Sequence, residues 1–152
     1  MKDLSEATYI LGIRIYRDRS KGLFGLSQCT YIDKVLKRFS MYLSKKGFVP
    51  MVYGKHLSKS MCAKTQVERD NMSRIPHASA IGSIMYAMLC ISPDVLFSLS
   101  ITSRFQVNYG EEHWKAVKNI LKYLRRPNDM LIYGDSELKV RVHRCQNPDR
   151  QG

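Results

Sequence analysis

The stretches Thr8-Tyr-Ile-Leu-Gly-Ile-Arg-Ile-Tyr16 and Gly22-Leu-Phe-Gly-Leu-Ser-Gln28 decide how the chain begins to fold. Every second residue from Leu11 to Ile15 is apolar, which is the period of a β-strand with one buried face. The polar residues 18–22 between the stretches predict a turn, because Gly22 can adopt a positive φ. The second stretch is also short and largely apolar, so the two together predict a β-hairpin.

The segment after the hairpin predicts an amphipathic helix that runs to about Met41. Its apolar residues recur at steps of three and four and are Tyr31, Val35, Leu36 and Phe39. The side chains expected to face outward are Lys34, Lys37 and Arg38. Ser27 or Thr30 is the expected cap of the N-terminus. Because an isolated two-stranded hairpin is only marginally stable, we expect residues 1–39 to be less stable than residues 78–126.

Residues 45–74 predict an irregular linker, because Gly47, Pro50 and Gly54 interrupt any periodic pattern. Three helices are expected beyond it, over residues 75–92, over residues 95–106 and from Gly110 to Pro127. In the first, Ala78 with Gly82 and Ser79 with Ser83 place small side chains four residues apart, which predicts close approach of another helix. The bulky residues expected to pack there are Ile81, Met85, Met88 and Leu89.

The third of these helices has the clearest amphipathic pattern. Its apolar stripe is Trp114, Val117, Leu121 and Leu124. Its basic stripe is Lys115, Lys118, Lys122 and Arg125. Such a stripe is either a solvated helix face or a site of phosphate contact, and both interpretations stay open.

The pattern of elements predicts an α+β fold with four segments. Residues 1–44 form the hairpin and its helix, and residues 45–74 form the linker. Residues 75–134 form the helical region, which ends in a short strand candidate at residues 130–133. Residues 135–152 are expected to be a loose, disordered tail.

The charge of the chain favours polyanionic partners. Lys and Arg number 25 against 13 Asp and Glu, which gives a formal net charge of +12. Nucleic acid is the first candidate and an anionic membrane surface the second, with a merely basic soluble protein as the alternative. No secretory signal is evident, and the apolar-leaning run at residues 78–91 is shorter than the roughly 18 residues of a membrane-spanning helix. We therefore expect an intracellular protein, cytoplasmic or nuclear, without a membrane partner.

Residues that could support catalysis or hold a metal are scattered along the chain. Cysteines 29, 62, 90 and 145 form no C-x-x-C pair, so reduced and mostly buried thiols are expected rather than a zinc site. The paired carboxylates Glu111 and Glu112 stand at a helix N-terminus, where they complement the macrodipole. No Tyr-x-Asp-Asp turn and no Gly-rich phosphate loop occurs. We therefore assign no catalytic residue, no metal ligand and no cofactor to the chain.

Three further blocks carry a resemblance to a known family. They are His77-Ala-Ser-Ala-Ile-Gly-Ser-Ile-Met-Tyr-Ala-Met-Leu89, then Pro93-Asp94-Val95 with Ser103-Arg104-Phe105-Gln106, and then His113-Trp-Lys-Ala-Val-Lys-Asn-Ile-Leu-Lys-Tyr-Leu-Arg-Arg126. Together with the hairpin, in this order and spacing, they resemble the reverse transcriptase of copia-type retrotransposon Pol polyproteins. The resemblance covers residues 1–141, in the region downstream of the polymerase active site.

The resemblance implies nucleic-acid-binding elements rather than a catalytic centre. The hairpin resembles the primer grip, and the helices resemble the thumb and the connection toward ribonuclease H. The implied contacts with an RNA/DNA template–primer duplex are Gly12, Arg14, Lys34, Lys37, Arg38, Lys115, Lys118, Lys122 and Arg125. Gly12 either lets nucleic acid approach the backbone or relieves crowding in the sheet. The magnesium-binding aspartates of the parent enzyme lie N-terminal to this region in the family, so we expect the fragment to lack them.

Several departures from the family pattern widen the alternatives. Ser92 stands where arginine is usual, and Tyr109 where proline is common. The tail reads Val142-His-Arg-Cys145, and a shift of one nucleotide could give Tyr-Thr-Asp-Ala, which resembles the start of ribonuclease H. We therefore interpret the tail as out-of-frame. The chain is then a polymerase fragment that associates with other parts of the Pol polyprotein, a stand-alone nucleic-acid-binding module, or a degraded reading frame.

Overall fold

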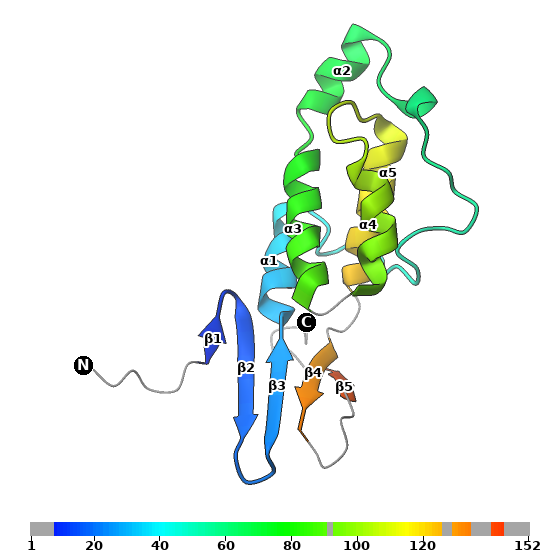
Figure 1. Ribbon diagram of the computed structural model, residues 1–152. Helices are drawn as coiled ribbons and strands as arrows, with labels where there is room; N and C mark the ends of the chain where they lie inside the picture. The colour runs from blue at the N-terminus through cyan, green and yellow to red at the C-terminus, as the bar shows by residue number, and fades with distance from the viewer. Residues whose placement is uncertain (1–7, 91–92, 126–128, 135–140, 145–152) are drawn as a thin grey trace.

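A computed structural model of the chain describes residues 8–90, 93–125, 129–134 and 141–144. Figure 1 shows a group of helices above an antiparallel sheet that extends away from them. The five strands are, in chain order, β1 (Tyr9–Ile10), β2 (Ile13–Asp18), β3 (Leu23–Ser27), β4 (Asp129–Tyr133) and β5 (Arg141–Arg144). The helices are α1 (Cys29–Arg38), η1 (Lys59–Met61), α2 (Gln66–Ser73), α3 (His77–Cys90), η2 (Pro93–Val95), α4 (Leu96–Ser103) and α5 (Glu111–Leu124). The α+β class that the sequence predicts is confirmed.

The predicted hairpin is formed by β2 and β3. Their register runs from Arg14 opposite Ser27 to Asp18 opposite Leu23. In the connecting turn, Asp18 Oδ1 accepts hydrogen bonds from the backbone nitrogens of Ser20 and Lys21 at 3.1 and 3.3 Å. Gly22 has a φ of +62°, as the turn requires.

The first stretch is not one continuous strand, and this part of the strand prediction is wrong. Tyr9 pairs with Arg14 and Ile10 with Ile13, so Leu11 and Gly12 form a two-residue turn. Both have positive φ values, 51° and 78°. This conformation matches the twist of the flanking strands, and glycine at the second position lowers its cost. Leu11 is consequently 81% exposed rather than buried.

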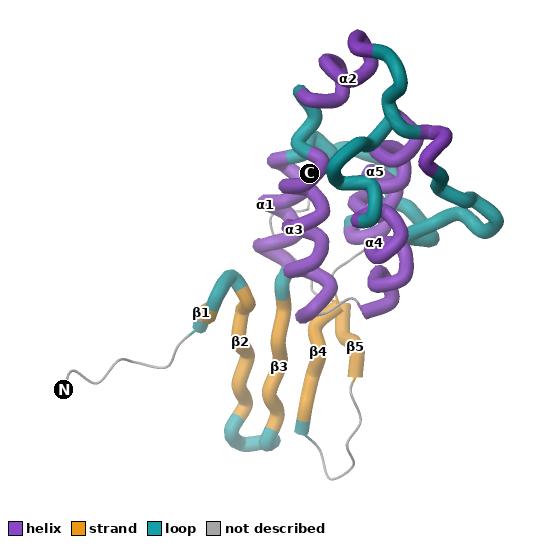
Figure 2. The backbone as a smooth tube through the Cα atoms, turned by 45° about the horizontal axis from the view of Figure 1, so that its top comes forward, coloured by secondary structure: helices purple, strands orange, loops and turns teal. Residues whose placement is uncertain are grey.

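The hairpin does not stand alone, because a second pair of strands extends the sheet. Leu26 of β3 lies opposite Leu131 of β4, and β5 pairs with β4 in turn, so the sheet has the order β1-β2-β3-β4-β5 (Figure 2). Residues 141–144 are therefore regular where a loose tail was expected. A strand edge offers unpaired backbone groups that a further strand can satisfy. The remainder of the expected tail lies outside the described residues.

The predicted helices α1, α3, α4 and α5 are confirmed, with α1 ending earlier than Met41. Ser40 has a φ of +56°, its nitrogen donates to the Lys37 carbonyl, and the Met41 nitrogen donates to the Leu36 carbonyl at 2.8 Å. These two bonds form a Schellman motif, which ends a helix by satisfying its last carbonyls. At the other end, Gln28 is the N-cap and makes no side-chain capping bond.

The hydrophobic core lies among the helices and not against the sheet. Figure 1 shows α1 on one side of α3 and both α4 and α5 on the other. The side chains of the core include Leu36 from α1, Ile84 from α3 and Leu99 from α4, with Ile120 and Leu121 from α5. No side chain of β2 is buried. The helices therefore supply most of the hydrophobic stabilisation.

The face that α3 buries differs from the predicted one. Gly82 is exposed and a Cβ there would meet nothing within 4 Å, so no helix approaches it. Met85 is 45% and Leu89 74% exposed. Ile81 and Met88 are buried as predicted, and the other buried apolar side chains of α3 in the described part of the chain are Ala80, Ile84 and Ala87. The observed buried positions follow a helical period, as the predicted ones do. The sequence is compatible with both, because α3 is apolar on most of its circumference.

Residues 45–74 contain more structure than the irregular linker that was expected. Thr65 Oγ1 accepts a hydrogen bond from the Glu68 nitrogen at 3.2 Å, and Glu68 Oε2 accepts one from the Thr65 nitrogen at 3.2 Å. This capping box starts α2, and its T-x-x-E pattern is visible in the sequence. None of the helices in the described part of the chain is both long and apolar enough to cross a membrane.

Two glycines give a matched test of the packing. A Cβ on Gly110 would lie 1.9 Å from the Met61 carbonyl oxygen, whereas one on Gly82 enters open space on α3. We expect Gly110→Ala to lower the free energy of unfolding by roughly 1–3 kcal/mol through overpacking. Gly82→Ala should raise it by roughly 0.5–1 kcal/mol, because alanine is the better helix former. Urea denaturation measures both, and equal effects of the two substitutions would contradict the packing at Gly110.

The distribution of burial also predicts where the chain opens first. Amide hydrogens of β2 and β3 should exchange faster than those of α3 and α5, because β2 contributes no buried side chain. Hydrogen–deuterium exchange with peptide resolution makes the comparison. Equal protection of the sheet and the helices would show that the sheet shares the stability of the core.

Candidate nucleic-acid interface

The basic side chains of α1 face away from the core. Lys34, Lys37 and Arg38 are exposed, while Val35 and Leu36 are buried. Lys37 Nζ lies 5.1 Å from the centroid of the Tyr42 ring, close enough for a cation–π interaction with the segment that follows the helix. The predicted outward orientation of these three side chains is confirmed.

The basic side chains of α5 have more varied surroundings. Lys115 Nζ lies 3.0 Å from Glu111 Oε1 and 2.9 Å from Glu112 Oε1, and Lys55 Nζ lies 3.0 Å from Glu112 Oε2. The hydrogen bonds from Lys115 and Lys55 lower the pKa of Glu112 to about 2. The hydrogen bonds that Lys115 donates to Glu112 and Glu111 raise the pKa of Lys115. Lys115 therefore has carboxylate partners within the chain, which weakens its attraction for an external anion.

Among the described residues, the other cations of α5 form no ion pair, although the Tyr123 hydroxyl donates to the Asp94 carboxylate at the same end of the helix. Lys118 Nζ lies 6.0 Å from the centroid of the Trp114 ring. Lys122 and Arg125 are half-buried near the C-terminal end. Residues 113–128 contain no Asp or Glu. This end of α5 is therefore more suitable for phosphate contact than its N-terminal turn.

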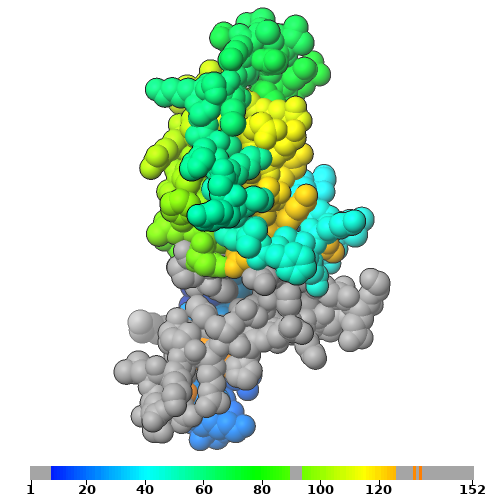
Figure 3. Space-filling view, turned by 90° about the vertical axis from the view of Figure 1, so that its right-hand side faces the viewer, coloured from blue at the N-terminus to red at the C-terminus, as the bar shows by residue number. Residues whose placement is uncertain are grey.

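A single backbone contact joins the segment after α1 to α5. The Gly47 nitrogen donates to the Lys122 carbonyl at 2.9 Å, and a Cβ on Gly47 would lie 3.0 Å from the Tyr123 nitrogen. In Figure 3 the segment after α1 (cyan) lies against the C-terminal half of α5 (orange). We name the cations at the end of α1, in the segment after it and at its contact on α5 the α1–α5 basic surface; they are Lys37, Arg38, Lys45, Lys46 and Lys122.

The α1–α5 basic surface includes two residues that the sequence prediction missed. Lys45 and Lys46 are exposed, and each is within two residues of Gly47. The doubled lysine was visible but fell in the segment interpreted as a linker. Residues 34–67 contain no Asp or Glu, so every side chain in this segment with a fixed charge is Lys or Arg. A surface of one sign attracts polyanions over a distance of about one Debye length, ~8 Å at physiological salt.

Gly12 and Arg14 lie at the turn between β1 and β2 rather than on the α1–α5 basic surface. A Cβ on Gly12 would be 3.9 Å from Tyr31, which is ordinary contact. The φ of +78° therefore explains glycine at this position better than a need for close approach. The Tyr86 hydroxyl donates to the Leu11 carbonyl, which holds this turn against α3. Arg14 is exposed beside the turn.

A buried cluster of rings fixes the start of α5. The His77 ring stacks on Tyr109 with centroids 4.2 Å apart and an interplanar angle of 14°. The Tyr109 hydroxyl lies 2.7 Å from the carbonyl oxygens of both Met72 and Ile75. His113 Nδ1 accepts a hydrogen bond from the Gly110 nitrogen at 3.0 Å. These contacts connect α2, α3 and α5.

Burial governs the protonation of this ring cluster. It lowers the pKa of His77 to about 4, and the nearby His113 acts in the same direction. It also lowers the pKa of His113, against the opposing effect of the Ser58 carbonyl and the Glu112 carboxylate. Both imidazoles are therefore neutral near pH 7. Neither ring nitrogen of His77 has a hydrogen-bond partner in the described part of the chain.

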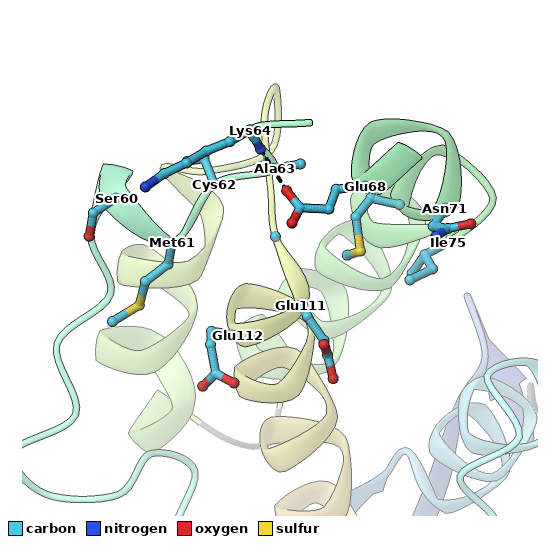
Figure 4. Close-up of a pocket in the computed structure, with 12 residues that line it drawn as sticks. Ser60, Met61, Cys62, Ala63, Lys64, Glu68, Asn71, Ile75, Glu111 and Glu112 are labelled. Atoms are coloured by element: carbon cyan, nitrogen blue, oxygen red, sulfur yellow. Dashed lines mark hydrogen bonds between the residues drawn. The ribbon is translucent and has the colours of Figure 1, made fainter. Parts of the chain in front are cut away.

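A pocket of about 580 Å³ opens beside this cluster and shows no catalytic arrangement. Figure 4 shows Glu68, Glu111 and Glu112 at its rim with Lys64 and Cys62. Across the described residues, no three His, Cys, Asp or Glu side chains are placed to hold a metal ion together. Cys29 and Cys62 are half-buried, where mostly buried thiols were expected. The side chains of the other two cysteines lie outside the description.

Comparison with known proteins identifies the relatives of the chain. It is 46% identical over 138 residues to the retrovirus-related Pol polyprotein from transposon TNT 1-94 of Nicotiana tabacum, which covers 90% of the chain and 10% of the relative. It is 32% identical over 152 residues to the corresponding polyprotein from transposon RE1 of Arabidopsis thaliana, which covers 100% of the chain and 10% of the relative. A shorter match, 37% identical over 54 residues, covers 36% of the chain and 38% of the secreted RxLR effector protein 161 of Plasmopara viticola.

The homologues of the chain are therefore retrovirus-related Pol polyproteins of plant transposons, and the chain spans about a tenth of their length. No family model matches it, and neither does any solved structure.

The depressed pKa of His77 predicts a stability that falls with acidification. His77 binds a proton near pH 6.5 in the unfolded chain but only near pH 4 in the folded chain. The contribution of neutral His77 to the free energy of unfolding is therefore fully present above pH 6.5 and is lost as the pH falls toward 4. Because His77 is 1% exposed, we expect a loss of about 2–3 kcal/mol between about pH 7 and 4.5. Chemical denaturation at several pH values measures this.

Two variants separate His77 from other titrating groups. His77→Phe keeps a ring against Tyr109 and should flatten the dependence between pH 6.5 and 4.5, leaving the part due to His113. His56, which is exposed, serves as the control, and His56→Gln tests whether replacing any histidine changes the slope. A slope that survives in His77→Phe at its original size would contradict the assignment.

Proposed function

We propose that the chain is a portion of a copia-type reverse transcriptase and that its α1–α5 basic surface binds the phosphate backbone of a template–primer duplex. The observation that carries this proposal is the hydrogen bond from the Gly47 nitrogen to the Lys122 carbonyl, which places the segment with the exposed Lys45 and Lys46 against α5. Cations gathered by tertiary contacts can track a phosphate backbone without reading base sequence.

The homologous polyproteins support the family part of the proposal. They are retrovirus-related Pol polyproteins, and the chain aligns with one of them over 90% of its own length. The three sequence blocks and the β2–β3 hairpin are the features that resemble the reverse transcriptase region. RNA-directed DNA synthesis is then the activity of the parent enzyme, with magnesium as its cofactor, and this portion contributes template–primer binding.

A stand-alone nucleic-acid-binding module is the second candidate. The balance of charge, with 25 basic against 13 acidic side chains, favours it independently of the family. Both candidates predict binding of nucleic acid by the isolated chain. They differ in partner, because a portion of the polymerase associates with the rest of the Pol polyprotein while a module acts without it.

The proposal predicts binding that depends strongly on salt. If the chain neutralises about six phosphates, its affinity for an RNA–DNA hybrid should fall on the order of 10³-fold between about 50 and 200 mM salt. Neutralising four cations of the α1–α5 basic surface, in Lys37→Gln/Arg38→Gln/Lys45→Gln/Lys46→Gln, should lower the slope of log affinity against log salt by about 3–4. Fluorescence anisotropy with a labelled hybrid measures the slope.

A charge-matched variant controls for the overall field. Arg17, Lys21, Arg69 and Arg74 are exposed on β2, on the turn after it and on or just after α2. Replacing these four by glutamine removes the same formal charge and should lower the slope by less than about 1. Equal losses in both variants would mean that binding is spread over the molecule. Absence of binding at low salt would eliminate both candidate functions.

A further inference from the structure

We infer that the loop between Gly47 and Lys55, named here the aromatic loop, binds single-stranded nucleic acid by stacking bases on Phe48 and Tyr53. This inference rests on the proposed function, because it concerns the unpaired template strand beside the template–primer duplex. We assign this single strand and the duplex to two different parts of the chain. The duplex contacts the α1–α5 basic surface through phosphates, and the unpaired template contacts the aromatic loop through its bases.

The aromatic loop exposes rings that contribute nothing to the core. Phe48 is 82% and Tyr53 103% exposed, and Val49 and Val52 between them are 53% and 54% exposed. Several exposed apolar side chains within one short segment are typical of a contact surface, whereas single ones are common on any protein. Neither ring is part of the hydrophobic core cluster.

The aromatic loop is attached to α5 at both ends. Gly47 donates to the Lys122 carbonyl near the C-terminus of α5, and Lys55 Nζ is paired with Glu112 near its N-terminus. These two attachment points are ten residues apart on α5, which corresponds to about 15 Å of helix. The loop therefore runs along α5 in the opposite direction, on the α4–α5 side of the helices in Figure 1.

A turn presents one of the two rings. The Lys55 nitrogen donates to the Val52 carbonyl at 3.2 Å, which closes a β-turn with Tyr53 and Gly54 at its centre. Gly54 has a φ of +76°, a conformation that turns of this kind require at their third residue. Tyr53 therefore occupies the tip of a closed turn, and its exposure follows from the backbone conformation.

The charge around the rings selects the partner. The aromatic loop begins beside Lys45 and Lys46, and the chain from Lys34 to Val67 contains neither Asp nor Glu. Aromatic side chains next to a positive groove are the arrangement that binds single strands, because every base offers a π-face and every linkage a phosphate. In a duplex the base faces are covered by stacking, so the rings have no comparable contact there.

The test compares single-stranded and duplex ligands. Binding of the full chain to a labelled oligouridine of about 20 nucleotides, longer than common single-strand sites, is measured beside binding to the RNA–DNA hybrid. Phe48→Ala/Tyr53→Ala should weaken single-strand binding at least about tenfold and change hybrid binding less than about threefold. Phe48→Trp/Tyr53→Trp should retain it and show tryptophan quenching on binding beyond that of the wild-type Trp114.

A second pair of variants separates ring stacking from general apolar contact. Phe48→Leu/Tyr53→Leu keeps apolar bulk and removes the rings, so it should bind single strands as weakly as the alanine variant. Val107→Ala, at a side chain 100% exposed between α4 and α5, should have no effect. Circular dichroism checks that each variant is folded, which surface substitutions should not alter.

The outcomes distinguish this inference from the proposed function. Single-strand affinity that is unchanged in the alanine variant, or fully retained in the leucine variant, would overturn the inference. If, in that case, the variant with four neutralised cations of the α1–α5 basic surface still loses hybrid binding, the proposed function stands. Loss of binding to anionic vesicles in the alanine variant, with single-strand binding intact, would assign the aromatic loop to a membrane surface instead.

Discussion

The helices α1, α4 and α5 all pack against α3, and this arrangement determines the positions of the other segments. The side chains of α3 that mediate it are each at most 8% exposed and are Ala80, Ile81, Ile84, Ala87 and Met88. The alanines allow close approach of neighbouring helices, and the larger residues fill the space between them. The sheet contributes little to this core, since β2 buries no side chain. The segments outside these four helices are therefore held in place by their contacts with them.

Two glycines make the most important attachments. Gly47 places the segment after α1 on the backbone of α5, and Gly110 leaves room for the Met61 carbonyl oxygen to lie against the start of α5. In both cases a side chain would occupy the space of a neighbouring backbone, so the contact depends on the missing Cβ. The first contact places Lys45 and Lys46 beside α5, and with the Lys55–Glu112 ion pair it defines the path of the aromatic loop. The second joins η1 to the helices.

The helices could be predicted because their periodic patterns are long, and the β2–β3 hairpin because turn residues separate two apolar runs. The buried face of α3 could not be predicted, because this helix is apolar on most sides and only the helices packed against it determine which side is buried. The turn at Leu11 and Gly12 was missed because leucine rarely adopts a positive φ. Helix α2 had a visible capping box but too short a pattern. Lys45 and Lys46 were missed for a similar reason, since an aperiodic segment gives no orientation for its side chains.

The sequence alone determined the class of the fold, the excess of positive charge and the resemblance of its motifs to a polymerase region. These properties depend on composition and on neighbours within a few residues. Only the tertiary structure decided which cations share a surface, which of them face carboxylates, and which aromatic rings remain in water. Such properties depend on contacts between residues far apart in the chain, as between Gly47 and Lys122, and no local pattern encodes the distance between them.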